Sequence, residues 1–414
     1  MLCAFFDYPE VSYPGQIDEA DYGKNFAFWR KAAPDQLQWF SAPAYYFARE
    51  IREKLQVPVG IVGCNWGGTP SWAWMDEQAI REGGGEIVLR EYAEAVKNLD
   101  LKAYDEKFRN TPGTWASWRL DPFGDPISVG MMEGRSLDDL MREVFGPDFD
   151  PSTINPADYM PVMGPKSETR PCGLYESMLS QVSPYGLRGV LYYQGESDGD
   201  MHPELYETMF PALIRCFRRS WGEDLPFLFV QLAPFGHWLA CDGTPYRFVR
   251  RAQQHTADTV ENTGMAVISD IGMKLDIHPK KKGPVGQRLA LLARKLVYGE
   301  ELLCEAPTLC ELRDGEGEWR LRFKNAGNGL NLAAKTPDGA ETDPERLGGL
   351  RLFLENRELD MTGIRAYAEG DTVCLQGETL KSGRARAELG WDAWYRVNLY
   401  NSAGLPARPA KIEN

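Results

Sequence analysis

This 414-residue chain contains few histidines, no closely paired cysteines and no excess of basic residues. Only four histidines occur, so any reaction that needs an imidazole must use one of four side chains. The 46 Lys and Arg are outnumbered by 60 Asp and Glu, which gives a formal net charge of −14. This acidic balance argues against a nucleic acid as partner.

The eight cysteines form no C-x-x-C pair and do not lie beside paired histidines, so we expect no structural zinc site. In a chain of this size such thiols are typical of a reducing compartment. The opening residues MLCAFF lack the basic start of a signal peptide, and no apolar run approaches the length of a membrane span. These features predict a cytoplasmic protein with no membrane partner.

The first three quarters of the chain alternate between apolar runs and amphipathic segments. Residues 41–56 carry apolar side chains at helical spacing after Ser41, a plausible N-cap, and lead into an apolar strand at 57–63. Unbroken apolar runs of this kind are typical of strands covered on both faces. Similar strands, separated by helical segments around 204–219 and 248–260, are expected at 189–193, 226–232 and 265–270. The alternation predicts a parallel α/β sheet.

Two stretches depart from this alternation. Residues from about 83 to 170 are rich in loop signals around one helical stretch near 87–99, and we interpret them as an insertion over one end of the sheet. From residue 304, short alternating runs separated by turn residues predict a β-rich module. We therefore expect an α/β domain over 1–303 and a C-terminal module over 304–414. The lysine run at 280–282 is interpreted as a solvated turn.

Parallel α/β sheets bind ligands beyond the carboxyl ends of their strands, so the segments after each strand are the candidate sites. The strand at 57–63 is followed by CNWGGT at 64–69. Its adjacent Gly67 and Gly68 allow the backbone to approach a substrate and to offer N–H groups to an oxyanion. The same composition also fits a tight turn between strand and helix.

The second candidate segment is QGESDG at 194–199, which contains a G-x-S-x-G pattern after a strand. This pattern can mark a nucleophile elbow with Ser197 as nucleophile, and Asp276 and His278 would complete the order Ser, Asp, His. Against it, an elbow should lead directly into a helix, whereas residues 198–203 read as an extended turn. Ser197 therefore also fits a polar turn.

The third candidate segment, LDIHP at 275–279, lies between the last predicted strand and a helix that closes the sheet. Asp276 can orient the imidazole of His278 as a general base for an activated hydroxyl. An ion pair or a helix cap would give the same D-x-H spacing. The position in the α/β order favours catalysis, and the other three histidines have no comparable setting.

Together these segments resemble the motif blocks of the sialate O-acetylesterase family, a carbohydrate-esterase branch of the SGNH hydrolases. The matching blocks, in chain order, are NWGGT (65–69), LYESM (174–178), YQGES (193–197), RRAQ (250–253), DIHP (276–279) and NLYN (398–401). The resemblance implies a flavodoxin-like three-layer α/β/α fold. It also implies a serine esterase that acts on O-acetylated sugars without a metal or other cofactor.

The resemblance also implies roles for individual residues. His278 would be the base and Asp276 the residue that orients it. Oxyanion donors would come from the backbone of Gly67 or Gly68 and from the side chain of Gln194. The implied substrate-site residues are Asn65, Trp66, Glu196 and Arg250.

One motif of the family is missing. The family carries its nucleophilic serine in a G-Q-S-N-M segment at the end of its first sheet strand, and the 414 residues contain no such segment. Residues 5–9, FFDYP, already resemble the stretch that follows it. We therefore expect that this sequence starts late, and that the first strand and its serine lie upstream, where a signal peptide could also be hidden.

The leading hypothesis is an O-acetylesterase acting on sialic acids through an acyl-enzyme. One alternative is an esterase for acetylated xylan or another ester that uses Ser197 or Cys64, because a thiol beside a glycine pair is a competent nucleophile. Another is an inactive sugar-binding protein. Its stacking platforms, which also fit a core, would be Trp66, Trp72 and Trp74.

Overall fold

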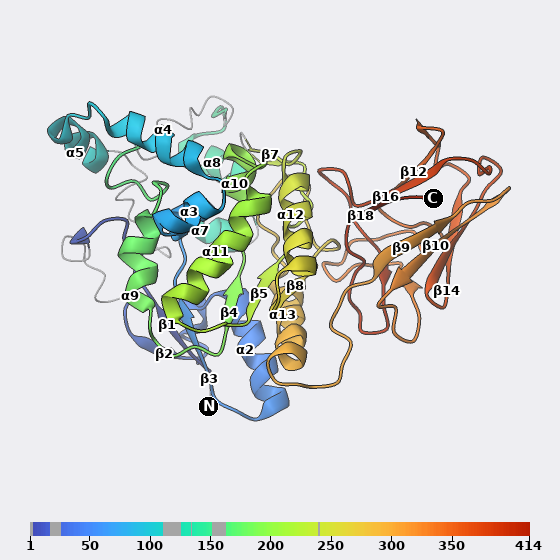
Figure 1. Ribbon diagram of the computed structural model, residues 1–414, viewed down its shortest axis with the longest axis horizontal. Helices are drawn as coiled ribbons and strands as arrows, with labels where there is room; N and C mark the ends of the chain where they lie inside the picture. The colour runs from blue at the N-terminus through green and yellow to red at the C-terminus, as the bar shows by residue number, and fades with distance from the viewer. Residues whose placement is uncertain (1–2, 17–25, 111–125, 134, 151–162, 239–240) are drawn as a thin grey trace.

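The computed structural model describes residues 3–16, 26–110, 126–133, 135–150, 163–238 and 241–414. It combines parallel strands and helices with an antiparallel, β-rich C-terminal region (Figure 1). The two parts have separate cores, because the hydrophobic cluster of the C-terminal region contains only residues from Leu309 onward. The mixed α/β fold with a β-rich end is therefore confirmed.

The first sheet of the α/β part holds the N-terminal strands. β1 (Cys3–Asp7) pairs in parallel with β3 (Val59–Gly63) and antiparallel with β2 (Trp29–Lys31). The short β2 caps one edge of this sheet, so β3 is the strand at its other end.

The second sheet is entirely parallel. β5 (Phe227–Val230) lies between β4 (Val190–Tyr192) and β8 (Thr263–Ala266). The sequence predicted a strand at 265–270, but β8 lies earlier and ends at Ala266. The residues that follow β8 are irregular because side chains and loops, not a neighbouring strand, satisfy their backbone groups.

Helices cover both faces of β5. Its Phe227 and Phe229 join one hydrophobic cluster, whereas Leu228 and Val230 join another. Successive side chains of a strand point to opposite faces, so the two clusters are the two sides of one layer. The helices on the first side are α11 (Tyr206–Trp221) and α12 (Tyr246–Thr259), and those on the second side are α2 (Ala42–Leu55) and α13 (Lys282–Leu296).

The layer contains an open seam between β3 and β4. In the part of the chain that the structure describes, no strand pairs with the outer edge of either one. The two sheets share one core, because Val59 of β3 and Leu191 of β4 both pack against the hydrophobic cluster to which α2 and α13 contribute. All three β4 residues are only partly buried and Gly60 is exposed, while β5 is fully buried. Inner parallel strands are normally covered and bonded on both edges, so these two are unfinished edges.

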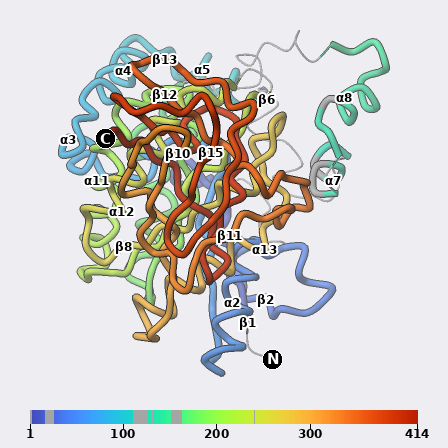
Figure 2. Tube along the Cα trace, turned by 90° about the vertical axis from the view of Figure 1, so that its right-hand side faces the viewer, coloured from blue at the N-terminus to red at the C-terminus, as the bar shows by residue number. Residues whose placement is uncertain are grey.

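Residues 83–170 contain more helix than the sequence suggested. Only the helix near 87–99 was expected, and it corresponds to α4. The others were missed; Tyr104 and Phe108, for instance, form an i, i+4 apolar pair that packs on Tyr13. The helices formed by its described residues are α4 (Glu86–Val96), α5 (Leu101–Asn110), α7 (Pro126–Met132) and α8 (Leu137–Phe145). α7 and α8 lie at the periphery (Figure 2).

The C-terminal region is built from antiparallel strands with the expected alternation. In β10, Trp319, Leu321 and Phe323 are buried, and Arg320 and Arg322 face solvent. Two four-stranded sheets enclose this core, in the orders β14-β15-β10-β9 and β13-β12-β16-β18. The strands are β9 (Thr308–Arg313), β10 (Glu318–Lys324), β12 (Leu350–Leu354), β13 (Arg357–Glu358), β14 (Arg365–Glu369), β15 (Thr372–Gln376), β16 (Ala385–Leu389) and β18 (Ala410–Glu413).

Three further observations concern the described residues. None of their helices has the length and apolar character needed to cross a membrane. Among the same residues, no group of three or more His, Cys, Asp and Glu side chains could hold a metal ion. All eight cysteines are free.

Candidate active site

The loops after β3 and β4 meet at the carboxyl end of the seam. The amide Nε2 of Gln194 donates a hydrogen bond to the carbonyl oxygen of Thr69 at 3.1 Å. Ser71 donates from its backbone N–H to Oδ2 of Asp198 at 2.9 Å and from its hydroxyl to Oδ1. These bonds fasten two of the three predicted motif segments to each other.

Asp198 is the residue of this junction that sequence reasoning missed. It lies in the short helix α10 (Glu196–Met201) and is 1% exposed. Burial raises the pKa of its carboxyl group to about 6, even though hydrogen bonds from Ser71 and Gln194 favour the charged form. The one available signal was its position four residues after Gln194, which places the two side chains together at the start of a helix.

The glycine pair after β3 forms an exposed turn. Gly68 has a φ of +75°, a left-handed conformation that favours glycine. A Cβ atom added at Gly67 or Gly68 would meet no other atom within 4 Å, so the turn is open to solvent. Within the described ranges, neither backbone N–H donates a hydrogen bond. Two donors are therefore available beside the seam.

The side chain of Gln194 is fully engaged. Its Nε2 donates to Thr69 and Asp198, and its Oε1 accepts a hydrogen bond from the hydroxyl of Tyr192 at 2.8 Å. The predicted role of Gln194 as an oxyanion donor would therefore require that one of its two Nε2 bonds be released. Gly67 and Gly68 can act without any such change.

His278 and Asp276 form the hydrogen-bonded pair that the sequence suggested. Nδ1 of His278 lies 3.0 Å from Oδ1 of Asp276, and the backbone N–H of His278 donates to the same oxygen at 2.8 Å. The imidazole is half-exposed, and its ring centre lies 4.9 Å from that of Trp238 in an edge-on arrangement. With Nδ1 held by the carboxylate, Nε2 is the nitrogen left to accept a proton.

Neighbouring groups stabilise the negative charge of Asp276. Its Oδ2 lies 3.0 Å from Nζ of Lys280. Partial burial raises the pKa of Asp276, but hydrogen bonds from His278 and Lys280 outweigh this effect and lower the pKa to about 2. The carboxylate is thus ionised at neutral pH and stabilises a protonated imidazole.

Glu196 lies within electrostatic reach of the imidazole. Burial raises the pKa of its carboxyl group, while the charges of Lys282 and His278 act in the opposite direction. Lys282 begins α13, and its ammonium group lies 4.9 Å from the ring centre of Tyr193. The interpretation of 280–282 as a solvated turn was therefore wrong for Lys282, whose burial lowers its pKa.

Ser197 lies in a helix, contrary to expectation. Residues 198–203 were read as an extended turn, but α10 begins at Glu196 and continues to Met201. A nucleophile elbow should lead directly into a helix, and α10 meets this condition. In the described part of the chain, however, no hydrogen bond joins the hydroxyl of Ser197 to His278, whose Nδ1 is taken by Asp276.

Cys64 follows β3 directly and is largely shielded from solvent. Burial, reinforced by the nearby carboxyl group of Asp7, raises the pKa of its thiol to about 12. A thiol becomes a good nucleophile when its pKa is lowered by a positive environment. Cys64 has the opposite environment, so it remains a protonated thiol at neutral pH.

The remaining predicted residues are divided between surface and core. Asn65 is exposed beside the glycine pair. Arg250, in contrast, is 2% exposed, and its Nη2 donates to the carbonyl oxygen of Asp392 at 2.8 Å. The structure therefore does not bring Arg250 to the other candidates, and its predicted contact with substrate has no support.

Three tryptophans considered as sugar platforms are core residues. Trp66, Trp72 and Trp74 are 4–6% exposed and belong to the cluster packed under α11 and α12. The indole nitrogens of Trp72 and Trp74 donate to Thr169 O and Thr69 Oγ1. A buried ring offers no face to a sugar, so the burial of these rings argues against the platform interpretation, and the predicted contact of Trp66 with substrate has no support.

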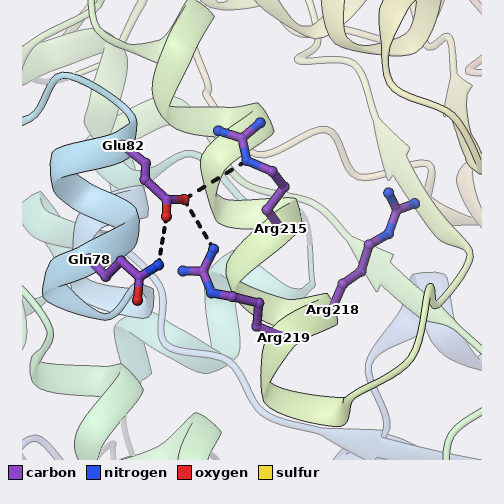
Figure 3. A pocket seen from close by; sticks show the side chains of 5 residues that line it. All are labelled: Gln78, Glu82, Arg215, Arg218 and Arg219. Carbon is purple, nitrogen blue, oxygen red and sulfur yellow. Dashed lines mark hydrogen bonds and ion pairs between the residues drawn. The ribbon is translucent and has the colours of Figure 1, made fainter.

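A hollow on another part of the surface does not belong to this site. It lies between α3 (Glu77–Glu82) and α11 (Figure 3). Arg219 contacts Glu82 at 3.0 Å, Arg215 lies 3.9 Å from the same carboxylate, and Arg218 pairs with Asp224 at 2.9 Å. None of the candidate residues lines this hollow, and acidic partners already balance its arginines.

Comparisons with known proteins agree with the motif assignment. Residues 166–294 match the family described as "carbohydrate esterase, sialic acid-specific acetylesterase". Sialate O-acetylesterase from Rattus norvegicus is 29% identical over 284 residues, which cover 64% of this chain and 44% of the rat protein. The human sialate O-acetylesterase is 26% identical, with 66% and 43% covered. This chain thus spans less than half the length of these curated relatives.

A solved structure gives the same indication. The crystal structure of a carbohydrate acetylesterase from Xanthomonas citri is similar to this chain with a TM-score of 0.65 and 26% sequence identity. The similarity covers 99% of this chain and 73% of that chain. The resemblance inferred from the motifs is therefore confirmed.

Proposed function

We propose that this protein is a carbohydrate O-acetylesterase of the SGNH-hydrolase fold that deacetylates sialic acids, because residues 166–294 match the family of sialic acid-specific acetylesterases. The observation that carries the proposal is the His278–Asp276 pair, with 3.0 Å between Nδ1 and Oδ1. Both residues lie inside the matched segment, and the loops after β3 and β4 supply the remaining polar groups.

The proposed reaction uses the free Nε2 of His278. This nitrogen takes the proton of a nucleophilic hydroxyl group while the oxygen of that hydroxyl group attacks the acetyl carbonyl carbon. The oxyanion that forms accepts hydrogen bonds from the backbone of Gly67 and Gly68. The bond to the sugar oxygen then breaks, and this oxygen takes the proton from His278. Water hydrolyses the acyl-enzyme by the same steps and releases acetate.

The proposed origin of the nucleophile is a strand that pairs in the seam. Such a strand would run parallel to β3 and β4, so its carboxyl end would arrive between the glycine turn and Gln194. The unfinished edges of both strands and their partly buried side chains support this placement. Cys64 is disfavoured by the raised pKa of its thiol, and Ser197 by its lack of a bond to the base.

The two alternative functions have less support. A sugar-binding protein without catalysis would need accessible aromatic faces, but the three tryptophans proposed for this role are buried. An esterase for acetylated xylan would use the same base and donors, and no described residue favours that substrate over a sialic acid.

The test is release of acetate from 9-O-acetylated sialic acid, with acetylated xylan as the competing substrate. In the chain extended at its N-terminus by an apolar strand that ends in Gly-Gln-Ser-Asn-Met, His278→Ala should lower the rate by about 10²–10⁴, the usual contribution of a general base. His255→Ala is the matched control, because His255 is exposed on α12 and should leave the rate unchanged. If His278→Ala leaves the rate of the extended chain unchanged, the proposed mechanism is wrong.

The origin of the nucleophile is tested separately. We expect activity to rise strongly when the chain is extended at its N-terminus by an apolar strand that ends in Gly-Gln-Ser-Asn-Met. Serine to alanine in the added strand should abolish this gain. If the 414-residue chain is already active and Ser197→Ala or Cys64→Ala abolishes the activity, the seam proposal fails while the esterase proposal stands.

A further inference from the structure

The loop that carries the base has almost no regular structure of its own. This base loop, residues 267–281 between β8 and α13, contains one isolated bridge, between Met273 and Asp276, but no helix or strand. Nevertheless Ser269, Asp270 and Ile271 are at most 2% exposed. Contacts from elsewhere in the fold must therefore fix its course.

Helix α13 supplies the first of these contacts. Arg288 forms two parallel hydrogen bonds with the carboxylate of Asp270, each 2.7 Å long, and donates to the carbonyl oxygen of Val267 at 2.9 Å. The ion pair is buried, with side chains 5% and 0% exposed. A bidentate pair of this kind fixes both the position and the orientation of the carboxylate.

The C-terminal region supplies the second set. The hydroxyl of Tyr400 donates to Oδ2 of Asp270 at 3.1 Å. The backbone N–H of Val397 donates to the carbonyl oxygen of Ser269 at 3.1 Å, and the hydroxyl of Ser269 donates to Ala407 O at 2.7 Å. The base loop is therefore bonded to a part of the chain that follows it by more than a hundred residues.

Arg396 reaches furthest along the loop toward His278. Its guanidinium group donates to the carbonyl oxygens of Asp270 at 3.1 Å and Gly272 at 3.2 Å. The same guanidinium group also donates hydrogen bonds to the carboxylate of Asp338 and to Oγ1 of Thr336. One side chain thus joins the C-terminal region to two backbone carbonyl groups of the base loop.

Gly272 leaves the loop little room to shift. A Cβ atom at this position would lie only 2.0 Å from the carbonyl oxygen of Pro234. Two residues later, the carbonyl oxygen of Lys274 accepts hydrogen bonds from the backbone of Gly236 and His237. A displacement at Gly272 would therefore be transmitted to the bridge at Asp276 and to the imidazole.

From these contacts we infer that Arg396 is a positioning residue for His278, and that the C-terminal region completes the active site. The expected effect of Arg396 on the reaction rate depends on the proposed function, whereas its expected effect on the base loop does not. A 1 Å displacement of a catalytic group can cost about 10²-fold in rate. In the chain extended by the serine strand, Arg396→Ala should therefore lower kcat about 10- to 100-fold and leave KM within about twofold.

The experiment compares Arg396→Ala with Arg408→Ala. Arg408 also joins the C-terminal region to the α/β part, through two hydrogen bonds of 2.9 and 3.0 Å to Asp258, but none of its bonds goes to the base loop. Amide hydrogen exchange should be about tenfold faster or more over residues 267–281 in Arg396→Ala, and unchanged there in Arg408→Ala. Arg396→Lys, which keeps the charge but loses the planar fork, should recover part of the protection.

The outcomes separate the two proposals. Unchanged exchange over 267–281 in Arg396→Ala, or equal acceleration in Arg408→Ala, overturns the positioning role whatever the activity. If the chain extended by the serine strand releases no acetate, the proposed function fails, but the exchange comparison on the 414-residue protein still decides the role of Arg396. Should Arg396→Ala not fold, Arg396→Lys takes its place in the same comparison.

Discussion

The carboxylate of Asp198 lies 2.9 Å from the backbone nitrogen of Ser71, a residue 127 positions earlier in the chain. This contact crosses the carboxyl end of the seam, where no strands of the described residues pair to join the two sheets. The contact therefore connects the two sheets at this point, as strand pairing would, and it holds the glycine turn close to Gln194.

Asp198→Asn should change how stability depends on pH. Because the pKa of Asp198 is raised to about 6 in the folded state, its contribution to stability is fully present below the unfolded pKa near 4. It is lost as the pH rises through 6. Asn does not titrate, so from pH 4 to pH 7 the free energy of unfolding of the variant should gain on the unchanged protein by on the order of 2–3 kcal/mol.

Urea denaturation at several pH values measures this difference. Asp35→Asn, at an exposed position, is the matched control and should give a difference that is independent of pH. A pH-independent difference for Asp198→Asn as well would contradict the burial of this carboxylate.

Asp276→Asn should have the opposite pH dependence. The pKa of Asp276 is lowered to about 2, so its contribution to stability is present above pH 4 and is lost as the pH falls toward 2. The variant should be less stable by about 1 kcal/mol at pH 6 and close to the unchanged protein near pH 2. Chemical denaturation at pH 6, 4 and 2.5 tests this. A larger deficit at the lowest pH would show that the sign is wrong.

The two neighbouring glycines should respond differently to alanine. Gly68→Ala forces a side chain into the left-handed region at φ +75° and should reduce stability by about 1 kcal/mol. Gly67 has no such φ, and a methyl group there meets nothing within 4 Å, so Gly67→Ala should change stability little. Urea denaturation of both variants measures the contrast. Equal losses would mean that the turn is not as described.

Cys64 should resist alkylation in the folded protein. A thiol with its pKa raised to about 12 is almost entirely protonated at pH 8, and only the thiolate reacts. Iodoacetamide should modify Cys64 at least about 100-fold more slowly in the folded chain than in urea, as measured by peptide mass spectrometry. Rapid labelling of the folded chain would restore Cys64 as a candidate nucleophile.

Sequence patterns predicted those elements whose burial repeats along the chain. The unbroken apolar run of β5 indicated a strand covered on both faces, and the alternation of β10 indicated one covered on a single face. Motif order predicted that His278 would pair with Asp276. In these cases the necessary information lies within a few neighbouring residues.

Contacts between distant residues could not be predicted in this way. Nothing near Asp198 indicates Ser71 as its partner, and nothing near Arg396 indicates the carbonyl oxygen of Gly272. Arg250 was misplaced for the same reason, because its burial against Asp392 depends on how the C-terminal region packs. Each of these contacts exists only once both parts of the chain have folded.

The contacts of Arg396 have a consequence for synthesis on the ribosome. Domains generally fold from the N-terminus as the chain emerges, and His278 leaves the ribosome long before Arg396, Val397 and Tyr400. Until these residues follow, the peptide around the base lacks most of the partners that hold it. The nascent chain thus carries the proposed general base in an unfinished setting, and the last quarter of translation completes that setting.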